Sequence, residues 1–328
     1  MKKRKFGDTG LTVGEVGMGC WELSGVSRGG GMGYGPQDDA DSVGVIKRAL
    51  ELGIDFFDTA DAYGLGHSEV VLGRTLKSTE QTPFVATKVG NNFYVQPWGK
   101  SFERGYIENA VENSLQRLGL DRVGLYQLHN PPLDVIKSGD VFETLENLKR
   151  QGKIRYYGVS LNTPEEGAAA IATAPSLAAI MCPYNILEQE NGVFFSEAQE
   201  RGVAIIARSP LASGRLTGAF TEQTEFAEGD YRATLGKAWL VDSVAKVGQL
   251  RFLLNDSTPT LAQAALKFIL ANRAVTLVVP GPKTKSELED NVRASTSAPM
   301  AAQDLNRLKQ LAQEGLLSAP PSRAPLKR

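Results

Sequence analysis

Residues 56–64 read Phe-Phe-Asp-Thr-Ala-Asp-Ala-Tyr-Gly, an apolar run that turns into small and polar residues. The apolar part is typical of a buried strand, and it leaves Asp58 and Tyr63 where that strand ends. A tyrosine beside a carboxylate can donate a proton when a nearby cation lowers its pKa. Taken alone, the stretch is more typical of a helix N-terminus capped by Asp58 or Thr59. The rest of the chain decides between these interpretations.

On both sides of this stretch, short β-branched runs alternate with amphipathic stretches of helical length. Strands that are each followed by a helix predict a parallel sheet with right-handed crossovers. Eight such units favour an α/β fold of the (β/α)8 TIM barrel type. An open doubly wound sheet is the alternative, although no Gly-x-Gly-x-x-Gly motif follows the first strand. The expected strands are 16–19, 56–59, 84–89, 123–129, 154–160, 178–184, 203–209 and 277–280, and the expected helices are 42–52, 68–77, 106–118, 141–150, 164–173, 192–201, 261–271 and 286–294.

Several segments lie outside this repeat. Residues 3–13 predict an N-terminal β-hairpin. An extra helical insertion, about residues 215–258, follows the seventh strand. Residues 25–36 are too rich in glycine for a helix and predict a mobile loop. We expect residues 1–318 to form a single barrel domain and residues 319–328 to form a disordered C-terminal tail.

The composition excludes several classes of protein. With 42% hydrophobic residues, 22% charged residues and a net charge of -1, the 328-residue chain shows no sign of a nucleic-acid or anionic-membrane partner. Two cysteines, Cys20 and Cys182, are too few for a disulfide framework and fit a reduced cytosol. Two histidines and no Cys-x-x-Cys motif argue against a metal site. No apolar run approaches the roughly 18 residues that span a bilayer, so we expect a cytoplasmic protein.

Polar residues stand at the ends of several predicted strands, where a barrel places its chemistry. Lys88 lies in an otherwise apolar run, and Asp58 ends the neighbouring strand. Such a pair is more often a structural salt bridge than a catalytic one, and a single histidine such as His129 is more often a core residue. Together, however, Asp58, Tyr63, Lys88 and His129 would converge on one mouth of the barrel. Packing alone explains that convergence poorly.

These residues belong to a longer series of motifs. The series is Phe-Asp-Thr-Ala-Asp-Ala-Tyr-Gly at 57–64, Ala-Thr-Lys at 86–88, Leu-His-Asn-Pro at 128–131, Gly-Val-Ser at 158–160, Ser-Pro-Leu-Ala-Ser-Gly at 209–214, and Pro-Gly at 280–281 with Asn291. In this order and spacing, the chain resembles the aldo-keto reductase family, in its bacterial type, over about residues 3–315.

The resemblance implies a catalytic mechanism without a metal. A nicotinamide cofactor would deliver hydride to a carbonyl carbon, and Tyr63 would supply the proton. Lys88 would lower the pKa of Tyr63, with Asp58 holding the lysine in place. His129 would hydrogen-bond the substrate oxygen and orient it.

The resemblance also implies a cofactor site, with departures from the family pattern. Ser160 matches the serine that binds the carboxamide, but the asparagine expected next to it comes one place later, as Asn162. Met181 replaces a usual glutamine, and Arg208 takes the place of an aromatic residue that stacks on the nicotinamide. The expected cofactor-binding residues are Gly19, Cys20, Trp21, Asp58, Ser160, Asn162, Arg208, Ser209, Pro210, Leu211, Ser213, Gly214, Gly281, Lys283, Thr284, Glu287 and Asn291.

The resemblance places Lys283 and Thr284 in the positions that contact the 2′-phosphate, and the predicted helix that follows them would add backbone amides to this cation and hydroxyl. Glu287 carries a negative charge and would weaken the preference for a cofactor with a 2′-phosphate. We therefore expect NADPH/NADP+ as cofactor, with NADH as a weaker alternative. The expected substrate-binding residues are Trp21, Tyr63, His129, Phe93 and Trp98.

The resemblance thus implies an NADP(H)-dependent oxidoreductase that reduces aldehydes or ketones to alcohols. One alternative is a dehydrogenase that runs the reverse oxidation of a sugar or a secondary alcohol. The other is a non-catalytic NADP(H)-binding regulatory subunit, like the potassium-channel β subunits. The expected partner is a small-molecule carbonyl substrate, and the sequence predicts no particular oligomeric state.

Overall fold

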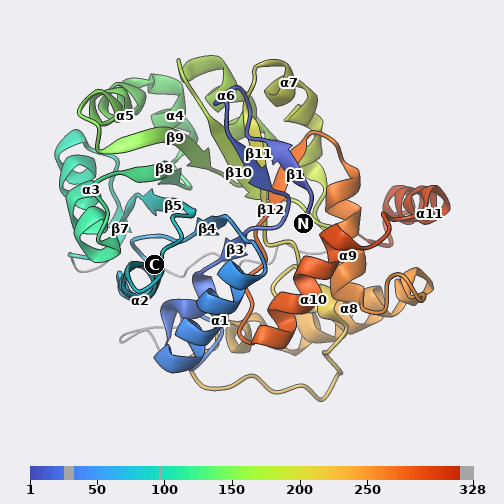
Figure 1. The fold of residues 1–328 in the computed structure, drawn as a ribbon. Coiled ribbons are helices and arrows are strands. Elements are labelled where there is room, and N and C mark those ends of the chain that lie inside the picture. Colours follow the sequence, from blue (N-terminus) through green and yellow to red (C-terminus); the bar gives the residue numbers. More distant parts are fainter. Residues whose placement is uncertain (26–32, 96–97, 318–328) are drawn as a thin grey trace.

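The barrel strands follow each other around the ring in chain order. The computed structural model describes residues 1–25, 33–95 and 98–317, and within these ranges eight parallel strands form one sheet. Helices cover the outside of this sheet (Figure 1). The strands are β3 (Met18–Gly19), β4 (Phe56–Asp58), β5 (Phe84–Val89), β8 (Val123–His129), β9 (Ile154–Ser160), β10 (Ala179–Pro183), β11 (Ala204–Arg208) and β12 (Val275–Val278).

The first and last strands close the ring. Gly17 N donates to Val278 O at 2.8 Å, and Gly19 N donates to Pro280 O at 2.9 Å. In the other direction, Val278 N donates to Glu15 O at 3.0 Å. Because both edges of the sheet are paired, the fold is the predicted (β/α)8 barrel and not the open sheet.

The outer helices bury one apolar face each against the strands. In α6 the helix start is fixed by a capping box between Thr163 and Glu166, with Pro164 in the first turn. The predicted helix 192–201 divides into a 3₁₀ turn, η2 (Glu190–Phe194), and α7. The helices are α1 (Asp39–Glu51), α2 (His67–Lys77), α3 (Arg104–Leu118), α4 (Leu133–Ser138), α5 (Asp140–Arg150), α6 (Pro164–Thr173), α7 (Phe195–Glu200), α8 (Gly236–Gly248), α9 (Leu261–Ala271), α10 (Lys285–Thr296) and α11 (Ala302–Gln313).

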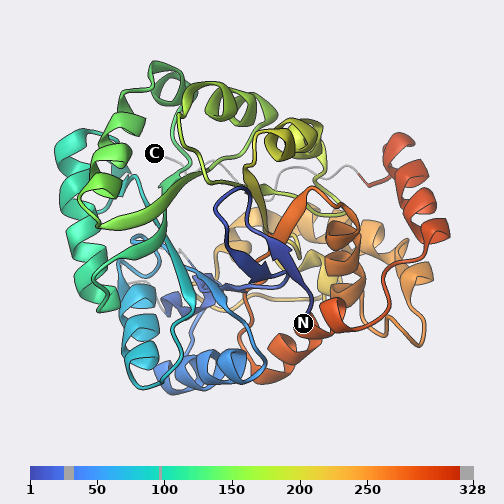
Figure 2. The ribbon, with the colours of Figure 1, turned by 45° about the horizontal axis from the view of Figure 1, so that its top comes forward.

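The predicted hairpin, β1 (Lys3–Lys5) and β2 (Thr12–Gly14), covers the N-terminal end of the barrel (Figure 2). The Phe6 ring packs 5.8 Å from the rings of both Phe56 and Phe84, which begin β4 and β5. Since this end is filled, the chemistry is left to the opposite end, where the strands finish.

The insertion after β11, the seventh barrel strand, contains the turns η3 (Arg215–Thr217), η4 (Tyr231–Leu235) and η5 (Arg251–Leu253) together with helix α8. It reaches back to the start of the chain, because Asp230 forms an isolated β-bridge with Tyr34. The predicted extra insertion is therefore confirmed.

Two sequence expectations fall on other parts of the chain. Residues 26–32 of the glycine-rich loop and the expected tail, 319–328, lie outside the described residues. Across the described ranges, no helix combines the length and the apolar character needed to cross a membrane.

Candidate functional site

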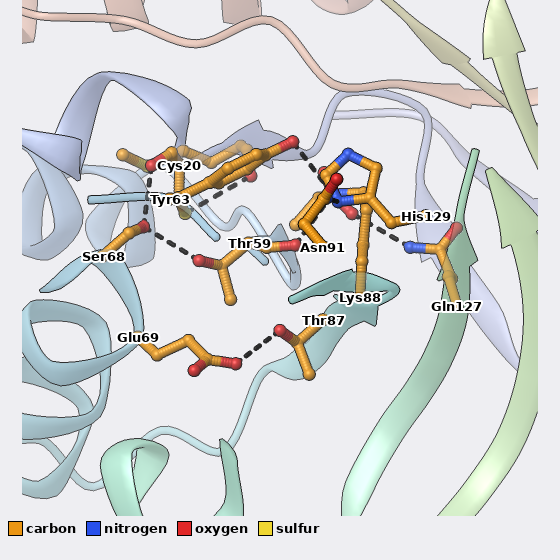
Figure 3. Close-up of polar contacts among 12 residues, drawn as sticks. Cys20, Thr59, Tyr63, Ser68, Glu69, Thr87, Lys88, Asn91, Gln127 and His129 are labelled. Atoms are coloured by element: carbon orange, nitrogen blue, oxygen red, sulfur yellow. Dashed lines mark hydrogen bonds and ion pairs between the residues drawn. The ribbon is translucent and has the colours of Figure 1, made fainter. Parts of the chain in front are cut away.

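A buried lysine forms the centre of the site at the C-terminal end of the barrel. Lys88 Nζ donates to Asp58 Oδ2 at 2.6 Å, to Thr59 O at 2.8 Å and to Tyr63 Oη at 3.2 Å. Only 1% of the Lys88 side chain and 5% of the Asp58 side chain are exposed. Adjacent strands supply the pair, since Asp58 ends β4 and Lys88 lies on β5. Figure 3 shows Lys88 extending from its strand toward Tyr63 and His129.

Gln127, a residue that the sequence did not predict for the site, completes the surroundings of Asp58. Its Nε2 donates to Asp58 Oδ1 at 3.1 Å, and the residue is fully buried on β8, opposite Lys88. The signal for Gln127 in the sequence is that a long polar side chain stands inside the otherwise apolar run 123–128. A buried amide needs a partner, and the end of the neighbouring strands offers one.

The pKa values in this cluster keep the tyrosine protonated and the lysine charged. Burial raises the pKa of Tyr63, and Lys88 acts against that rise without cancelling it. The lowering expected from Lys88 is present, but burial outweighs it, so the pKa of Tyr63 stays above its ordinary value. Burial lowers the pKa of Lys88, but Asp58 and Tyr63 raise it above its ordinary value. Burial likewise raises the pKa of Asp58, and Lys88 opposes that shift.

His129 and Trp21 border the Tyr63 ring. The His129 ring lies edge-on to Tyr63 with centroids 5.9 Å apart, and the Trp21 ring does so at 4.8 Å. The side-chain Nδ2 of Asn91 lies 2.9 Å from His129 Nδ1, a contact that the sequence did not predict. The structure thus brings all four predicted catalytic residues together, with Trp21 against them.

The expected substrate-binding residues Phe93 and Trp98 adjoin two short antiparallel strands, β6 (Asn91–Asn92) and β7 (Gly99–Lys100), and residues 96–97 lie outside the described residues. Phe93 follows β6 and packs on Tyr94 with ring centroids 4.4 Å apart. Trp98 precedes β7 and is half-buried. The strand β6 therefore joins the site through Asn91, which contacts His129.

The expected nicotinamide side contains the Ser160 hydroxyl, which has no hydrogen-bond partner among the described residues. Ser160 is the last residue of β9, and it is buried. Asn162 Oδ1 accepts from Arg208 Nη2 at 2.7 Å, and Leu161, between Ser160 and Asn162 in sequence, is fully buried. Met181 pairs with Ser160 in the sheet. The open Ser160 hydroxyl fits a bound carboxamide, whereas the Asn162 amide is already engaged by Arg208.

The turn after β11 has an unusual backbone. Ser209, Ala212 and Ser213 adopt left-handed φ values of 51°, 50° and 60°, which cost non-glycine residues energy and collect at functional sites. Gly214 continues the turn at φ 88°. Pro210 and Leu211 lie between these residues, so the cofactor-binding residues expected at 209–214 form one tight, strained segment.

Residues of the insertion that were not among the predicted site residues cover this turn. The Tyr231 hydroxyl donates to Ser213 Oγ, and Arg232 Nη1 lies 3.5 Å from Ser213 O. A Cβ on Gly214 would lie 3.0 Å from Arg232 Nη1. The position of a residue in a long insertion carries no periodic signal, so only the three-dimensional structure reveals these contacts.

The carboxylate of Glu287 lies where the 2′-phosphate is expected to bind, which is called the phosphate end below. Thr284 caps α10, and Glu287 Oε2 accepts from Lys283 N at 2.7 Å and from Thr284 N at 3.4 Å. The Lys283 ammonium donates to the Tyr34 carbonyl. Asn291 is buried on the same helix. Glu287 thus occupies the backbone amides that a 2′-phosphate would use.

A second carboxyl, Glu22, lies beside this end and was also missed. It is 8% exposed, and within the described part of the chain its Oε2 has no hydrogen-bond partner. A Cβ on Gly281 would overlap the Glu22 carboxyl, so Glu22 fills the space beside that glycine. Burial raises the pKa of Glu22 to about 7, with Glu287 adding to the rise and Lys283 and Arg232 opposing it.

The end of β3 connects the two halves of the site. Cys20 N donates to Asp58 O at 2.9 Å, and Cys20 itself is fully buried. Gly19 packs so closely that a Cβ would lie 2.9 Å from Val279 O. The backbone of residues 19–21 therefore runs between the Lys88 cluster and the phosphate end.

Comparisons with known proteins point to one family. A family model described as "Aldo/keto reductase family" matches residues 15–313. The holo form of aldo-keto reductase AKR11C1 from Bacillus halodurans is 32% identical, with a TM-score of 0.78 over 95% of this chain and 96% of that chain. The glycerol dehydrogenase AKR11B4 from Gluconobacter oxydans is 26% identical, with a TM-score of 0.79 over 97% and 96%.

A curated relative agrees with these structures. Aldo-keto reductase yakc of Schizosaccharomyces pombe, whose name specifies NADP(+), is 30% identical over 306 residues, which cover 89% of this chain and 86% of the relative.

Proposed function

Because the chain belongs to the aldo/keto reductase family, we propose that it is a nicotinamide-dependent oxidoreductase that reduces aldehydes or ketones to alcohols, with Tyr63 as proton donor. The observation that carries the proposal is the contact of Lys88 Nζ with both Tyr63 Oη and Asp58 Oδ2, at 3.2 Å and 2.6 Å. A structural salt bridge needs only the second of these contacts. The first adds a cation at the phenol of Tyr63, which follows the C-terminal end of β4.

Each residue of the cluster has a chemical part in this proposal. A bound nicotinamide supplies the hydride. The Tyr63 hydroxyl donates its proton to the carbonyl oxygen as negative charge develops there. Lys88 stabilises the phenolate that remains, and Asp58 with Gln127 keeps the ammonium in position. His129 hydrogen-bonds the same carbonyl oxygen and orients it, while Trp21 limits the space beside Tyr63.

The chain also offers groups for the cofactor. The Ser160 hydroxyl would bind the carboxamide, and the amides of the turn at 209–214 would face the pyrophosphate. For the adenosine phosphate, Lys283, Thr284 and the start of α10 favour NADP(H), whereas Glu22 and Glu287 oppose it. We therefore propose a moderate preference for NADP(H), with NADH as a weaker cofactor.

Oxidation of an alcohol is the second candidate. The same site can run in both directions, since the phenolate that reduction leaves on Tyr63 is the base that oxidation needs. The similarity to a glycerol dehydrogenase favours testing polyols and sugars in this direction. The direction of the reaction depends on which substrate binds, so the test below measures both reduction and oxidation.

The test is a screen of NADPH and NADH consumption with aldehydes, ketones and sugars, and of NADP+ reduction with polyols. We expect turnover with at least one carbonyl class, and loss of more than about nine-tenths of kcat in Tyr63→Phe while cofactor still binds. Tyr126→Phe is the matched control, because it also removes a buried tyrosine hydroxyl, one without a partner in the described ranges. Cofactor binding without turnover of any substrate would favour the regulatory-subunit alternative.

A further inference from the structure

The β6–β7 hairpin holds His129 at two points. Asn91 Nδ2 lies 2.9 Å from the ring atom Nδ1, and Lys100 Nζ donates to the His129 carbonyl at 2.7 Å. Asn91 and Lys100 face each other across the hairpin. Tyr106 Oη in turn donates to Asn91 O at 2.9 Å, which ties the base of the hairpin to α3. Figure 3 shows Asn91 beside the imidazole of His129.

The Asn91 contact determines where the imidazole carries its proton. A side-chain amide nitrogen only donates, so Nδ1 of His129 accepts this hydrogen bond. A neutral imidazole has one N–H, and the bond at one ring nitrogen decides which nitrogen keeps it. With Nδ1 accepting, the proton lies on Nε2.

We propose that Asn91 is a positioning residue that fixes His129 as the Nε2–H tautomer, so that Nε2–H is the donor to the substrate oxygen. This inference rests on the function proposed above for His129. It adds that β6 and the hydrogen-bond donor form one unit, because Asn91 begins β6 and Phe93 follows it. A displacement of β6 would therefore change the ring that orients the substrate.

Charged and titratable groups from several elements surround the imidazole. Tyr63 faces the ring from the loop after β4, Lys100 contacts its backbone from β7, and Lys88 and Asp58 lie behind Tyr63. A neutral His129 adds no further charge to this set. Its Nε2–H can then donate at any pH at which Tyr63 is still protonated.

The tautomer can be observed directly, because the chain has only two histidines, His67 and His129. Protein with ¹⁵N-labelled imidazoles gives two sets of ring signals, and His67→Gln identifies those of His129. We expect the Nε2–H pattern in the wild type at about pH 8, above the ordinary pKa of histidine. In Asn91→Asp, a carboxylate can only accept, so the proton should move to Nδ1.

The same variant has a distinct pH profile. The carboxylate introduced by Asn91→Asp would raise the pKa of His129 by favouring the imidazolium, which still carries Nε2–H at low pH. As pH rises through that pKa, the proton on Nε2 is lost and the donor disappears. We expect kcat of Asn91→Asp to fall at least about tenfold from about pH 6 to about pH 9, while the wild type stays level. A purely structural role would lower kcat equally at both values.

Asn92→Asp is the matched control, with the same change of charge one residue along β6. Asn92 Oδ1 accepts from Tyr94 N, a bond that a carboxylate keeps, so the tautomer and the pH profile should remain those of the wild type. An Nδ1–H pattern in the wild type overturns the proposal, as does an unchanged tautomer in Asn91→Asp. Because the spectra need no substrate, they test this inference even if the enzyme assay finds no turnover.

Discussion

Replacing Glu22 by glutamine should make the protein more stable, and increasingly so as pH rises. The Glu22 carboxyl is buried, and within the described residues its Oε2 has no partner to offset the loss of hydration. Burial therefore raises its pKa from 4.5 to about 7. The folded protein holds this proton more tightly than the unfolded chain does, so the wild type loses stability as pH rises between these two values.

The size of the effect follows from the two pKa values. A pKa change of one corresponds to about 1.4 kcal/mol, so ionised Glu22 costs about 3 kcal/mol at about pH 8 and about 1 kcal/mol at about pH 5. Glutamine keeps the shape of the side chain and cannot ionise. The free energy of unfolding of Glu22→Gln relative to the wild type should therefore increase by about 2 kcal/mol between these pH values.

Urea unfolding of the cofactor-free protein at these two pH values measures this difference. Glu51→Gln, which removes an exposed surface carboxylate paired with Arg48, is the control and should follow the wild type at both values. If the stability of Glu22→Gln relative to the wild type is the same at both pH values, the inference that Glu22 is a buried carboxylate without a compensating partner is refuted.

Three further predictions concern the chemistry. Lys88→Met should abolish reduction while circular dichroism and cofactor titration stay near those of the wild type; a variant that unfolds instead supports a purely structural salt bridge. Reduction by the wild type should stay constant through neutral pH and decline only at alkaline pH, because the raised pKa of Tyr63 keeps the donor protonated; a decline in kcat already at neutral pH contradicts this. Glu287→Arg should strengthen the preference for NADPH, because it frees the amides of Lys283 and Thr284 and adds a cation; equal or better kcat/KM with NADH in the wild type would show that the preference is wrong.

The sequence predicted strands best where they are continuous apolar runs. The bounds of β5, β8 and β9 agree with the predicted ranges, since both faces of these strands are covered. The last strand was placed two residues too late: β12 covers Val275–Val278 instead of 277–280. Pro280 has no N–H to continue the ladder, so the strand ends before it.

Other elements were not predicted. Helix α11 has apolar residues at helical spacing, but Leu308 is its only fully buried residue in the described structure, and Leu311 and Ala312 are only partly buried against the same cluster. Its position depends on packing against distant parts of the chain, which no local window contains.

The residues of the candidate site likewise divide into those that the sequence predicts and those that it does not. Asp58, Lys88 and His129 follow from strand ends, because parallel strands bring their carboxyl ends to one place. Asn91 and Glu22 lie beyond the ends of the barrel strands, and their contacts with His129 and Gly281 join residues far apart in the chain. Such contacts depend on loop conformation, which neither composition nor periodicity determines.

The closure of the ring has a consequence for how the chain folds during synthesis. The bridge between Val16 and Val278 encloses ~260 residues, so it carries the largest loop-closure cost of the sheet. During synthesis, β3 leaves the ribosome long before β12 exists and remains an open sheet edge. We expect the barrel to close only after the eighth strand is released, and pulse-labelled hydrogen exchange should show the amides of Gly17 and Gly19 becoming protected last.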